Sequence, residues 1–341
     1  MIQHDVDLTA ANTLGLPATA ERLVTVTSLA QAHEALVEAE RHDWPLTVIG
    51  GGSNLVLEPW LPGLVVRPAL TDYWLEPADG DTVRVHVGAG VNWHELVVAM
   101  AERGLWGIEN LALIPGQAGA APIQNIGAYG VELAEVLETV HLLERDGARE
   151  RVLGRDECAF GYRDSVFKHA LENRVIITRL VLRLSHRPRP RLDYGDLAAR
   201  VPASPSAADV VAAVSAVRRE KLPDPAVLGN AGSFFTNPIV DAEKAQRLLD
   251  EWPDMPHFPL PDGHVKLAAG WLIDRCGLKG VRDGHVGVHD RQALVLVHHG
   301  GGSAAELLAL AERVTAMVEA RFGVRLTREP RVLGEAVPGK A

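Results

Sequence analysis

Residues 113–130, LIPGQAGAAPIQNIGAYG, are rich in glycine and alanine and have neither helical nor strand periodicity. The bare backbone at Gly116, Gly119, Gly127 and Gly130 lets amides approach a bulky ligand and makes turns with positive φ available. A second stretch, VIGGGSNLV at 48–56, ends an apolar run with three glycines and then short polar side chains. Either stretch alone is typical of a connecting loop, but the pair favours a cradle for a phosphate or a ring.

The length and charge of the chain restrict what such a cradle can serve. With 341 residues we expect two or three domains, and a composition that is 47% hydrophobic and 23% charged is typical of a globular protein. A formal charge of −10 argues against nucleic acid and anionic membranes as partners, so an anionic ligand needs locally placed cations.

The location of the protein is predicted from features that the sequence lacks. Every apolar run is shorter than the ~20 residues of a membrane span, and the N-terminal residues do not resemble a signal peptide. Cys158 and Cys276 alone give no disulfide framework. We therefore expect a cytoplasmic protein with no membrane insertion.

Several familiar motifs are absent or incomplete. GAGVNW at 88–93 misses the third glycine of the dinucleotide fingerprint GxGxxG, and neither GxxxxGK[ST] nor GxSxG occurs. Fourteen histidines include His285, His289, His298 and His299, which have no acidic or cysteine partners at recognisable ligand spacing. We therefore expect no metal site and interpret these histidines as structural or surface residues.

The periodicity of the chain predicts alternating strands and helices. Strands are expected at 22–27, 46–49, 83–87, 137–143, 175–184 and 293–298, and helices at 28–41, 95–103, 207–219, 241–252 and 268–276. A capping box at Ser303 and Glu306 predicts a last helix that ends at Phe322. In that helix the residues expected to face the core are Leu307, Leu310, Val314, Met317 and Val318.

Two single side chains allow both a structural and a functional interpretation. Arg163, in YRDSVFK, could form a surface ion pair or cap a helix, but arginine is also the best side chain for gripping a carboxylate with two hydrogen bonds. Tyr194 lies in the segment 186–207, which is rich in proline and arginine, and tyrosine is a usual residue of binding loops. Both alternatives remain open for each residue.

Six segments in this order resemble one family. They are VIGGGSNLV, IPGQAGAAPIQNIGAYG, YRDSVFK, NAGSFFTNP, KLAAGWLID and REP, and over residues 17–334 they resemble the UDP-N-acetylenolpyruvoylglucosamine reductases, in the longer type with a tyrosine loop. The resemblance implies the α+β fold shared with vanillyl-alcohol oxidase. It divides the chain into an FAD-binding subdomain at 1–70, to which 325–341 return, a second at 71–222, and a substrate domain at 223–324.

The resemblance also implies a cofactor, a co-substrate and their contacts. FAD should bind without a covalent bond, because Ser53 and Asn54 stand where some relatives of this fold carry a linking histidine. NADPH is the implied co-substrate. The implied FAD contacts are Gly50, Gly51, Gly52, Ser53, Asn54, Leu55, Pro115, Gly116, Gly119, Ala120, Ala121, Ile123 and Gly127. The implied substrate contacts are Tyr129, Tyr194, Arg218, Lys221, Asn237, Lys279 and Gln292.

The implied reaction makes chemical demands that three residues can meet. Hydride addition to the β-carbon of an enolpyruvyl ether places negative charge on the carboxylate, and the α-carbon then needs a proton. Arg163 is the natural carboxylate clamp, and the resemblance implies that Ser233 donates the proton and that Glu329 stabilises the enol. A glutamate can do this only with a proton of its own, so we expect the pKa of Glu329 to be elevated in the complex.

Two other functions stay open at this point. One is a flavin oxidase of the same fold, which would need neither a proton-donating serine nor a site for a diphosphate. The other is a non-catalytic protein that binds a sugar nucleotide or a flavin, which would have no use for Arg163, Ser233 and Glu329 together. For the reductase we expect a monomer.

Overall fold

The computed structural model describes residues 1–335, and its internal contacts divide the chain into two units. Unit 1 comprises residues 1–6, 20–52 and 61–220, and unit 2 comprises 7–19, 53–60 and 221–341. Of the segment 325–341 predicted to return to the first subdomain, residues 336–341 lie outside the described part. The division into three domains stays a prediction.

Unit 1 contains a four-stranded sheet with a helix packed on it. Its strand order is β1 (Gln3–Asp7), β2 (Thr19–Val26), β5 (Trp60–Pro68), β3 (Leu46–Val48), with β3 and β5 parallel. The helix α1 (Leu29–Arg41) begins after Ser28, whose side chain accepts a hydrogen bond from the amide of Gln31. The predicted β-α-β unit is confirmed, but the long strand β5 was not predicted.

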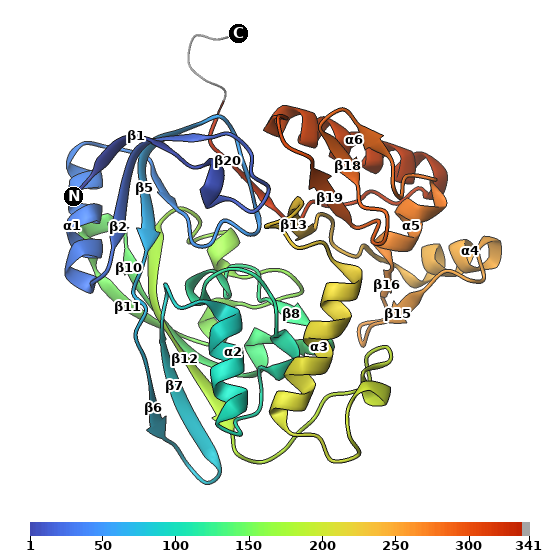
Figure 1. The fold of residues 1–341 in the computed structure, drawn as a ribbon, viewed down its shortest axis with the longest axis horizontal. Coiled ribbons are helices and arrows are strands. Elements are labelled where there is room, and N and C mark those ends of the chain that lie inside the picture. The colour runs from blue at the N-terminus through green and yellow to red at the C-terminus, as the bar shows by residue number, and fades with distance from the viewer. Residues whose placement is uncertain (336–341) are drawn as a thin grey trace. The chain divides into compact units, whose positions relative to one another are not determined.

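A second sheet of unit 1 is antiparallel and carries the larger core. Its order is β11 (Glu150–Gly154), β10 (Leu137–Glu144), β12 (Val175–Ser185), β7 (Thr82–Gly88), β6 (Tyr73–Pro77). The helices α2 (Trp93–Glu102) and α3 (Ala207–Lys221) contribute to the same core on one face of this sheet (Figure 1). The antiparallel order excludes a Rossmann sheet, which agrees with the rejection of the GxGxxG reading.

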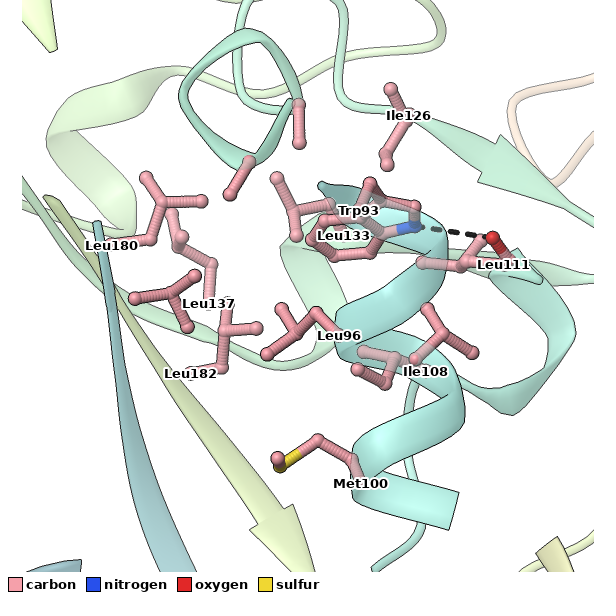
Figure 2. Packing of buried hydrophobic residues seen from close by; sticks show 14 of the residues in the cluster. Trp93, Leu96, Met100, Ile108, Leu111, Ile126, Leu133, Leu137, Leu180 and Leu182 are labelled. Atoms are coloured by element: carbon pink, nitrogen blue, oxygen red, sulfur yellow. Dashed lines mark hydrogen bonds between the residues drawn. The ribbon is translucent and has the colours of Figure 1, made fainter. Parts of the chain in front are cut away.

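The segment GAGVNW has a packing role instead. A Cβ on Gly90 would lie 2.7 Å from the Cα of Ala69, so this glycine allows two backbones to touch. Asn92 caps α2, and the buried Trp93 donates a hydrogen bond of 3.1 Å from its ring nitrogen to the carbonyl of Leu111. Figure 2 shows this bond, with Trp93 surrounded by leucines of the core.

Unit 2 is built from small sheets and three helices. One sheet has the order β13 (Gly229–Ser233), β19 (Val295–His298), β18 (Val286–Val288), β17 (Arg282–Asp283), and another has β14 (Ile239–Val240), β16 (Val265–Leu267), β15 (His257–Pro259). The helices are α4 (Ala242–Glu251), α5 (Ala269–Arg275) and α6 (Ala304–Phe322). In addition, β20 (Arg331–Leu333) pairs in parallel with β4 (Leu55–Leu57).

The last helix follows the sequence prediction with one exception. The capping box of Ser303 and Glu306 is formed, and Leu307, Leu310, Val314 and Val318 are buried. The prediction was wrong for Met317, which is 39% exposed. Successive helical residues point about 100° apart, so Met317 is turned away from the face that buries Val318.

Within residues 1–335, none of the helices combines the length and the apolar character needed to span a bilayer.

Candidate active site

The residues proposed from sequence fall into two groups, one in each unit. Unit 1 holds the first glycine loop as far as Gly52 and the whole of the second loop. It also holds Arg163, Tyr129, Tyr194 and Arg218. Unit 2 holds Ser53, Asn54, Leu55, Lys221, Ser233, Asn237, Lys279, Gln292 and Glu329.

In unit 1 the two glycine loops touch each other through bare backbone. A Cβ on Gly51 would lie 2.9 Å from the Cα of Gly116, which is closer than real Cβ contacts allow. Gly52 and Gly116 have φ of 63° and 115°, a backbone region that side chains disfavour. The loops can therefore keep this arrangement only with glycine at these positions, and the prediction that they act together has a steric basis.

Some polar groups in this cradle have no hydrogen-bond partner among residues 1–335. The buried Oε1 of Gln117 accepts no hydrogen bond from the described residues, and it would lie 3.1 Å from a Cβ on Gly50. Within the described chain, the amides of Gly50 and Gly51 likewise have no acceptor. Amides that await an acceptor beside close-packed glycines suit a diphosphate such as that of FAD, so the residues present fit this cofactor.

The rest of the second loop is tied to the core by its own backbone. The amide of Gly119 donates to the carbonyl of Ala89, and a Cβ on Gly119 would lie 2.6 Å from the Cβ of Ala89. Ala121 is buried, and the carbonyl of Ile123 accepts a 2.7 Å hydrogen bond from the hydroxyl of Ser165. Gly119 thus allows close packing against the core, while Gly116 and Ala120 lie beside the first loop.

Arg163 is held against the glycine loop by an unusual backbone. Its φ is 55°, a left-handed conformation that is rare for a residue with a long side chain and that concentrates at functional sites. Its Nη2 donates a 2.7 Å hydrogen bond to the carbonyl of Gly127, and its guanidinium lies 5.3 Å from the ring centroid of Tyr162. The helix-cap interpretation falls to Ser165, whose side chain accepts from the amide of Phe167.

A second arginine stands close to the tyrosines of unit 1. The Nε of Arg218 is buried without a hydrogen-bond partner among the described residues. Burial lowers the pKa of this guanidinium, the nearby Tyr129 raises it, and the positive charge of Arg163 lowers it. An unsatisfied buried cation of this kind is a suitable partner for an anion that arrives with a ligand.

Tyr129 and Tyr194 meet edge to face. Their ring centroids are 5.3 Å apart with an angle of 79° between the planes, although Tyr194 belongs to the separate segment 186–207 and is 51% exposed. Burial raises the pKa of the Tyr129 hydroxyl, which therefore stays protonated at neutral pH and can donate a hydrogen bond. The structure thus brings together three of the residues predicted to contact substrate: Tyr129, Tyr194 and Arg218.

In unit 2, Ser233 ends the strand β13, and Glu329 lies in the segment before β20 that contacts the chain just after Ser233. The amide of Glu329 donates a 2.9 Å hydrogen bond to the carbonyl of Phe234, the residue after Ser233. The buried rings of Phe234 and Phe235 anchor this strand in the core of the unit. The backbone next to Ser233 is therefore hydrogen-bonded to that of Glu329, although the two residues are 96 positions apart in the sequence.

The turn before Ser233 explains its orientation. The pairing of β13 with β19 is irregular between Asn230 and Ser233, and Gly232 has a φ of 69°. The side chain of Asn230 fixes this kink, because its Oδ1 accepts from the amide of Gly232 at 3.0 Å. The Asn-Ala-Gly-Ser sequence is thus a local device that aims the serine.

The first glycine loop continues into this same part of unit 2. The carbonyl of Ser53 lies 3.4 Å from the hydroxyl of Thr13, and the side chain of Asn54 reaches the carbonyl of Glu329 at 3.5 Å. Leu55 begins β4, the partner of β20. The segment predicted to contact the cofactor is therefore joined directly to the segment of Glu329 and to the strand β20 that follows it.

The remaining candidates of unit 2 are not all together. Asn237 accepts a 3.0 Å hydrogen bond from the amide of Ala269, and Gln292 borders Gly270, so both lie at the start of α5. Lys279 follows the other end of that helix, where its ammonium is 2.7 Å from the carboxylate of Asp274. Lys221 is exposed. Their roles as substrate contacts stay predictions.

Sequence reasoning missed Gln117 and His94. Gln117 lies inside the second loop, but its neighbours in the sequence do not indicate that its side-chain oxygen is buried beside Gly50. His94 accepts a 3.0 Å hydrogen bond from the amide of Leu113, where the loop begins. Burial lowers the pKa of His94, and the charges of Arg219 and Arg218 lower it further. A polar residue at the first turn of α2 was the only available signal.

The clustered histidines have structural partners. The Nδ1 of His298 contacts the carbonyl of Leu14, its Nε2 accepts from the amide of Gly302, and His285 contacts Glu306. No group of three or more His, Cys, Asp or Glu within residues 1–335 is arranged to hold a metal ion.

Comparisons with known proteins cover nearly all of the chain. The family model "FAD binding domain" matches residues 20–152, and "UDP-N-acetylenolpyruvoylglucosamine reductase, C-terminal domain" matches residues 224–333. These matches confirm the predicted α+β fold with its FAD-binding region.

Relatives named UDP-N-acetylenolpyruvoylglucosamine reductase are similar along their whole length. The protein of Pseudomonas aeruginosa is 50% identical over 97% of this chain and 98% of its own, and that of Cupriavidus pinatubonensis is 52% identical over 94% and 96%. A crystal structure of the reductase from Thermus caldophilus superposes with a TM-score of 0.69 at 28% identity, covering 98% of this chain and 100% of the other.

Proposed function

The chain belongs to the UDP-N-acetylenolpyruvoylglucosamine reductase family, and from this premise we propose that it uses NADPH to reduce the enolpyruvyl group of UDP-N-acetylglucosamine enolpyruvate, giving UDP-N-acetylmuramate. The chain is thus an oxidoreductase with an FAD-binding domain, in the synthesis of peptidoglycan precursors. The observation that supports the detailed proposal most is the pairing of Glu329 with the residue that follows Ser233.

The glycine loops would hold the cofactor without a covalent bond. In unit 1 the contacts would come from Gly50, Gly51, Gly52 and the loop from Pro115 to Ile123, with Gly127 beyond it. In unit 2 they would come from Ser53, Asn54 and Leu55. When bound, FAD would supply the hydride-transfer chemistry that links NADPH to the β-carbon of the substrate.

Arg163 would clamp the carboxylate of the enolpyruvyl group. Its guanidinium is already positioned by the carbonyl of Gly127, so little side-chain freedom is lost when an anion binds. Arg218 stands near Arg163 and supplies a second positive charge. Hydride addition places negative charge on the carboxylate, and fixed cations stabilise that charge more in the transition state than in the ground state.

Ser233 would give its hydroxyl proton to the α-carbon. Serine is a weak acid, so the enolate must be basic and the hydroxyl must be held at the correct face of the carbon. The kink at Gly232 and the anchoring of Phe234 provide that rigidity. Glu329 would stabilise the enol through a hydrogen bond, which requires that its carboxyl keep a proton in the complex.

The proposed contacts of the sugar nucleotide are polar side chains. Tyr129 and Tyr194 in unit 1 would contact the sugar and the diphosphate. In unit 2 the contacts would come from Lys221, Asn237, Lys279 and Gln292. Lys279 would have to leave Asp274, which is a modest cost because exposed ion pairs contribute little.

An anaerobic experiment tests the proposal. Purified protein is reduced with NADPH, and UDP-N-acetylglucosamine enolpyruvate is then added while the flavin absorbance is followed. We expect rapid reoxidation of the flavin without oxygen. A flavin that only oxygen reoxidises would favour the oxidase, and protein that never holds flavin would favour the binding protein. Replacing NADPH with NADH in the first step tests the choice of co-substrate.

The proposal also includes that the protein is a monomer and that it is located in the cytoplasm. Light scattering of the purified protein at several concentrations checks the first point, because a mass above 36.8 kDa that grows with concentration would contradict it. Fractionation of the producing cells checks the second.

A further inference from the structure

Asn110 is a completely buried polar residue outside the predicted site. It lies in the short 3-10 helix Glu109–Leu111, which packs beside α2, and its exposed fraction is 0%. Its Nδ2 donates one hydrogen bond of 2.8 Å to the carbonyl of Tyr129 and another of 2.9 Å to the carbonyl of Arg191. One side chain of the core therefore joins two segments that are 62 positions apart in the sequence.

The orientation of this amide is fixed by its surroundings. Both neighbouring atoms are carbonyl oxygens, which can only accept, so the nitrogen must face them and the amide cannot be flipped. The Oδ1 of Asn110 is left buried without a partner among the described residues. The side-chain hydrogen bonds of Asn110 are therefore the two that its Nδ2 donates, and an explanation of this buried residue has to rest on them.

Both of the joined segments carry a tyrosine. Tyr129 itself has a φ of 50°, a strained conformation that its neighbours must maintain, and the bond to its carbonyl acts at that point. Arg191 precedes Tyr194 by three residues, and its guanidinium is also held by Glu135 at 3.0 Å. The edge-to-face contact of the two tyrosine rings is therefore supported from beneath by the same amide.

We propose that Asn110 is a positioning residue, which holds Tyr129 and Tyr194 as one preorganised pair for the sugar nucleotide. This inference rests on the proposed function, in which the two tyrosines contact the substrate. Asn110 is buried beneath the backbone of both segments and acts only through them. Its contribution should consequently be to the binding of the sugar nucleotide and not to the reduction of flavin by NADPH.

The substitution Asn110→Asp tests the two donors while keeping the size of the side chain. At pH 8 the carboxylate can donate to neither carbonyl, so we expect the KM for the sugar nucleotide to rise about tenfold. The rate of flavin reduction by NADPH should stay within about twofold. At pH 6 a buried carboxyl gains a proton and recovers one donor, so the KM should fall back toward that of the unmodified protein.

Asn12→Asp is the matched control. Asn12 in unit 2 is also buried, and its Nδ2 also donates to carbonyls, those of Leu8 and Leu16, each at 3.0 Å, and that of Thr9 at 3.3 Å. The same substitution there should lower Tm but leave the KM unchanged. Equal changes of KM in both variants, or an unchanged KM in Asn110→Asp, would overturn the inference.

A double-mutant cycle with Tyr194→Ala gives a second measurement. If Asn110 acts through Tyr194, the rise of KM should be much smaller in the Tyr194→Ala background than in the unmodified protein. Additive effects would mean a general structural role. Should Asn110→Asp not fold, Asn110→Ser keeps one donor and enters the same cycle, with a rise of about threefold expected.

The outcomes separate this inference from the proposed function. If the unmodified protein fails to transfer hydride to the sugar nucleotide, the proposed function is wrong and the positioning role with it. If the unmodified protein is active and the cycle is additive, only the role of Asn110 is wrong.

Discussion

The glycine loops of unit 1 and the serine strand of unit 2 use opposite means to hold their candidate residues in place. Around Gly51 and Gly116 the protein removes side chains, so that backbone meets backbone and amides remain available. Around Ser233 and Glu329 it keeps side chains, and the buried phenylalanines that follow Ser233 anchor this part of the chain. The first region should therefore be sensitive to any added atom, and the second to the loss of a particular functional group.

The difference teaches which experiments are informative in each region. An added methyl group tests a glycine cradle, because it alters space without altering chemistry. An isosteric exchange tests the region of Ser233 and Glu329, because it changes the functional group without changing the size of the side chain. The following predictions use both kinds of change, and each could show that the contrast is false.

The largest effect is expected for Ser233→Ala. Loss of a proton donor costs about 10²- to 10⁴-fold in rate, so reoxidation of reduced flavin by the sugar nucleotide should slow by that factor. Flavin reduction by NADPH should be unchanged, since it needs no proton from this hydroxyl. Stopped-flow absorbance measures the two half-reactions separately. If both slowed equally, Ser233 would be a structural part of the cofactor site, and the contrast between the two regions would fail.

Glu329→Gln and Glu329→Ala together test which property of the Glu329 side chain matters. A protonated glutamate donates a hydrogen bond, and glutamine can still donate one, so Gln should be milder. We expect about 10-fold slower reoxidation for Gln and about 100-fold or more for Ala. Equal losses in the two variants would mean that a negative charge, or proton transfer itself, is what Glu329 provides.

Gly51→Ala tests the steric claim for unit 1. The new Cβ would meet the Cα of Gly116 at 2.9 Å, so the loops must separate, and we expect FAD to bind at least about tenfold more weakly by equilibrium titration. Gly104→Ala is the control, because an added Cβ there has nothing within 4 Å, while its positive φ, which Gly51 lacks, adds backbone strain alone. It should cost about 1–2 kcal/mol of stability and leave FAD affinity intact. FAD affinity that is equally reduced in both would refute the role of close contact.

The smallest effect is a difference in the pH response of the two units. The pKa of His94 in unit 1 is lowered below 6.5, mainly by burial, so the unfolded state takes up the proton more readily. The stabilising effect is complete above the unfolded pKa of about 6.5 and is lost as the pH falls below it. In unit 2 a bond to His285 lowers the pKa of Glu306 below 4.5, so its support is lost only at more acidic pH.

Hydrogen exchange measures this difference region by region. Between pH 7 and 5, backbone amides around 94–113 should lose protection more than those around 303–310 once the intrinsic rates are corrected. His94→Gln cannot titrate, so it should remove the pH dependence of the first region. A first region that responds no more than the second would contradict the assignment of His94.

Much of the local structure could be predicted from sequence because local signals carry it. Ser28 and Ser303 cap α1 and α6 as their motifs predict, and the strands β7, β10 and β12 follow their alternation. The strand β5 escaped because both of its faces are largely buried, which removes the alternation, and because Pro62 and Gly63 interrupt it.

The site could be predicted only as a set of residues. The glycines and Arg163 are visible in the sequence, but the bond from Arg163 to the carbonyl of Gly127 depends on a contact over 36 positions. The same is true of Asn110, whose residue type and neighbours give no hint of burial. Such contacts arise from tertiary packing, which no local pattern encodes.

The pairing of β20 with β4 has a consequence for the synthesis of the protein. Asn54 and Glu329 are 275 positions apart, so a ribosome has made almost the whole chain before the first glycine loop acquires its neighbour. Until then, β4 is an unpaired strand in a chain that is still growing, and closing so long a loop is slow. A nascent chain released at residue 325 would contain every glycine of the cradle and yet lack the strand that completes its end. Translation must therefore be nearly finished before β4 gains its strand partner.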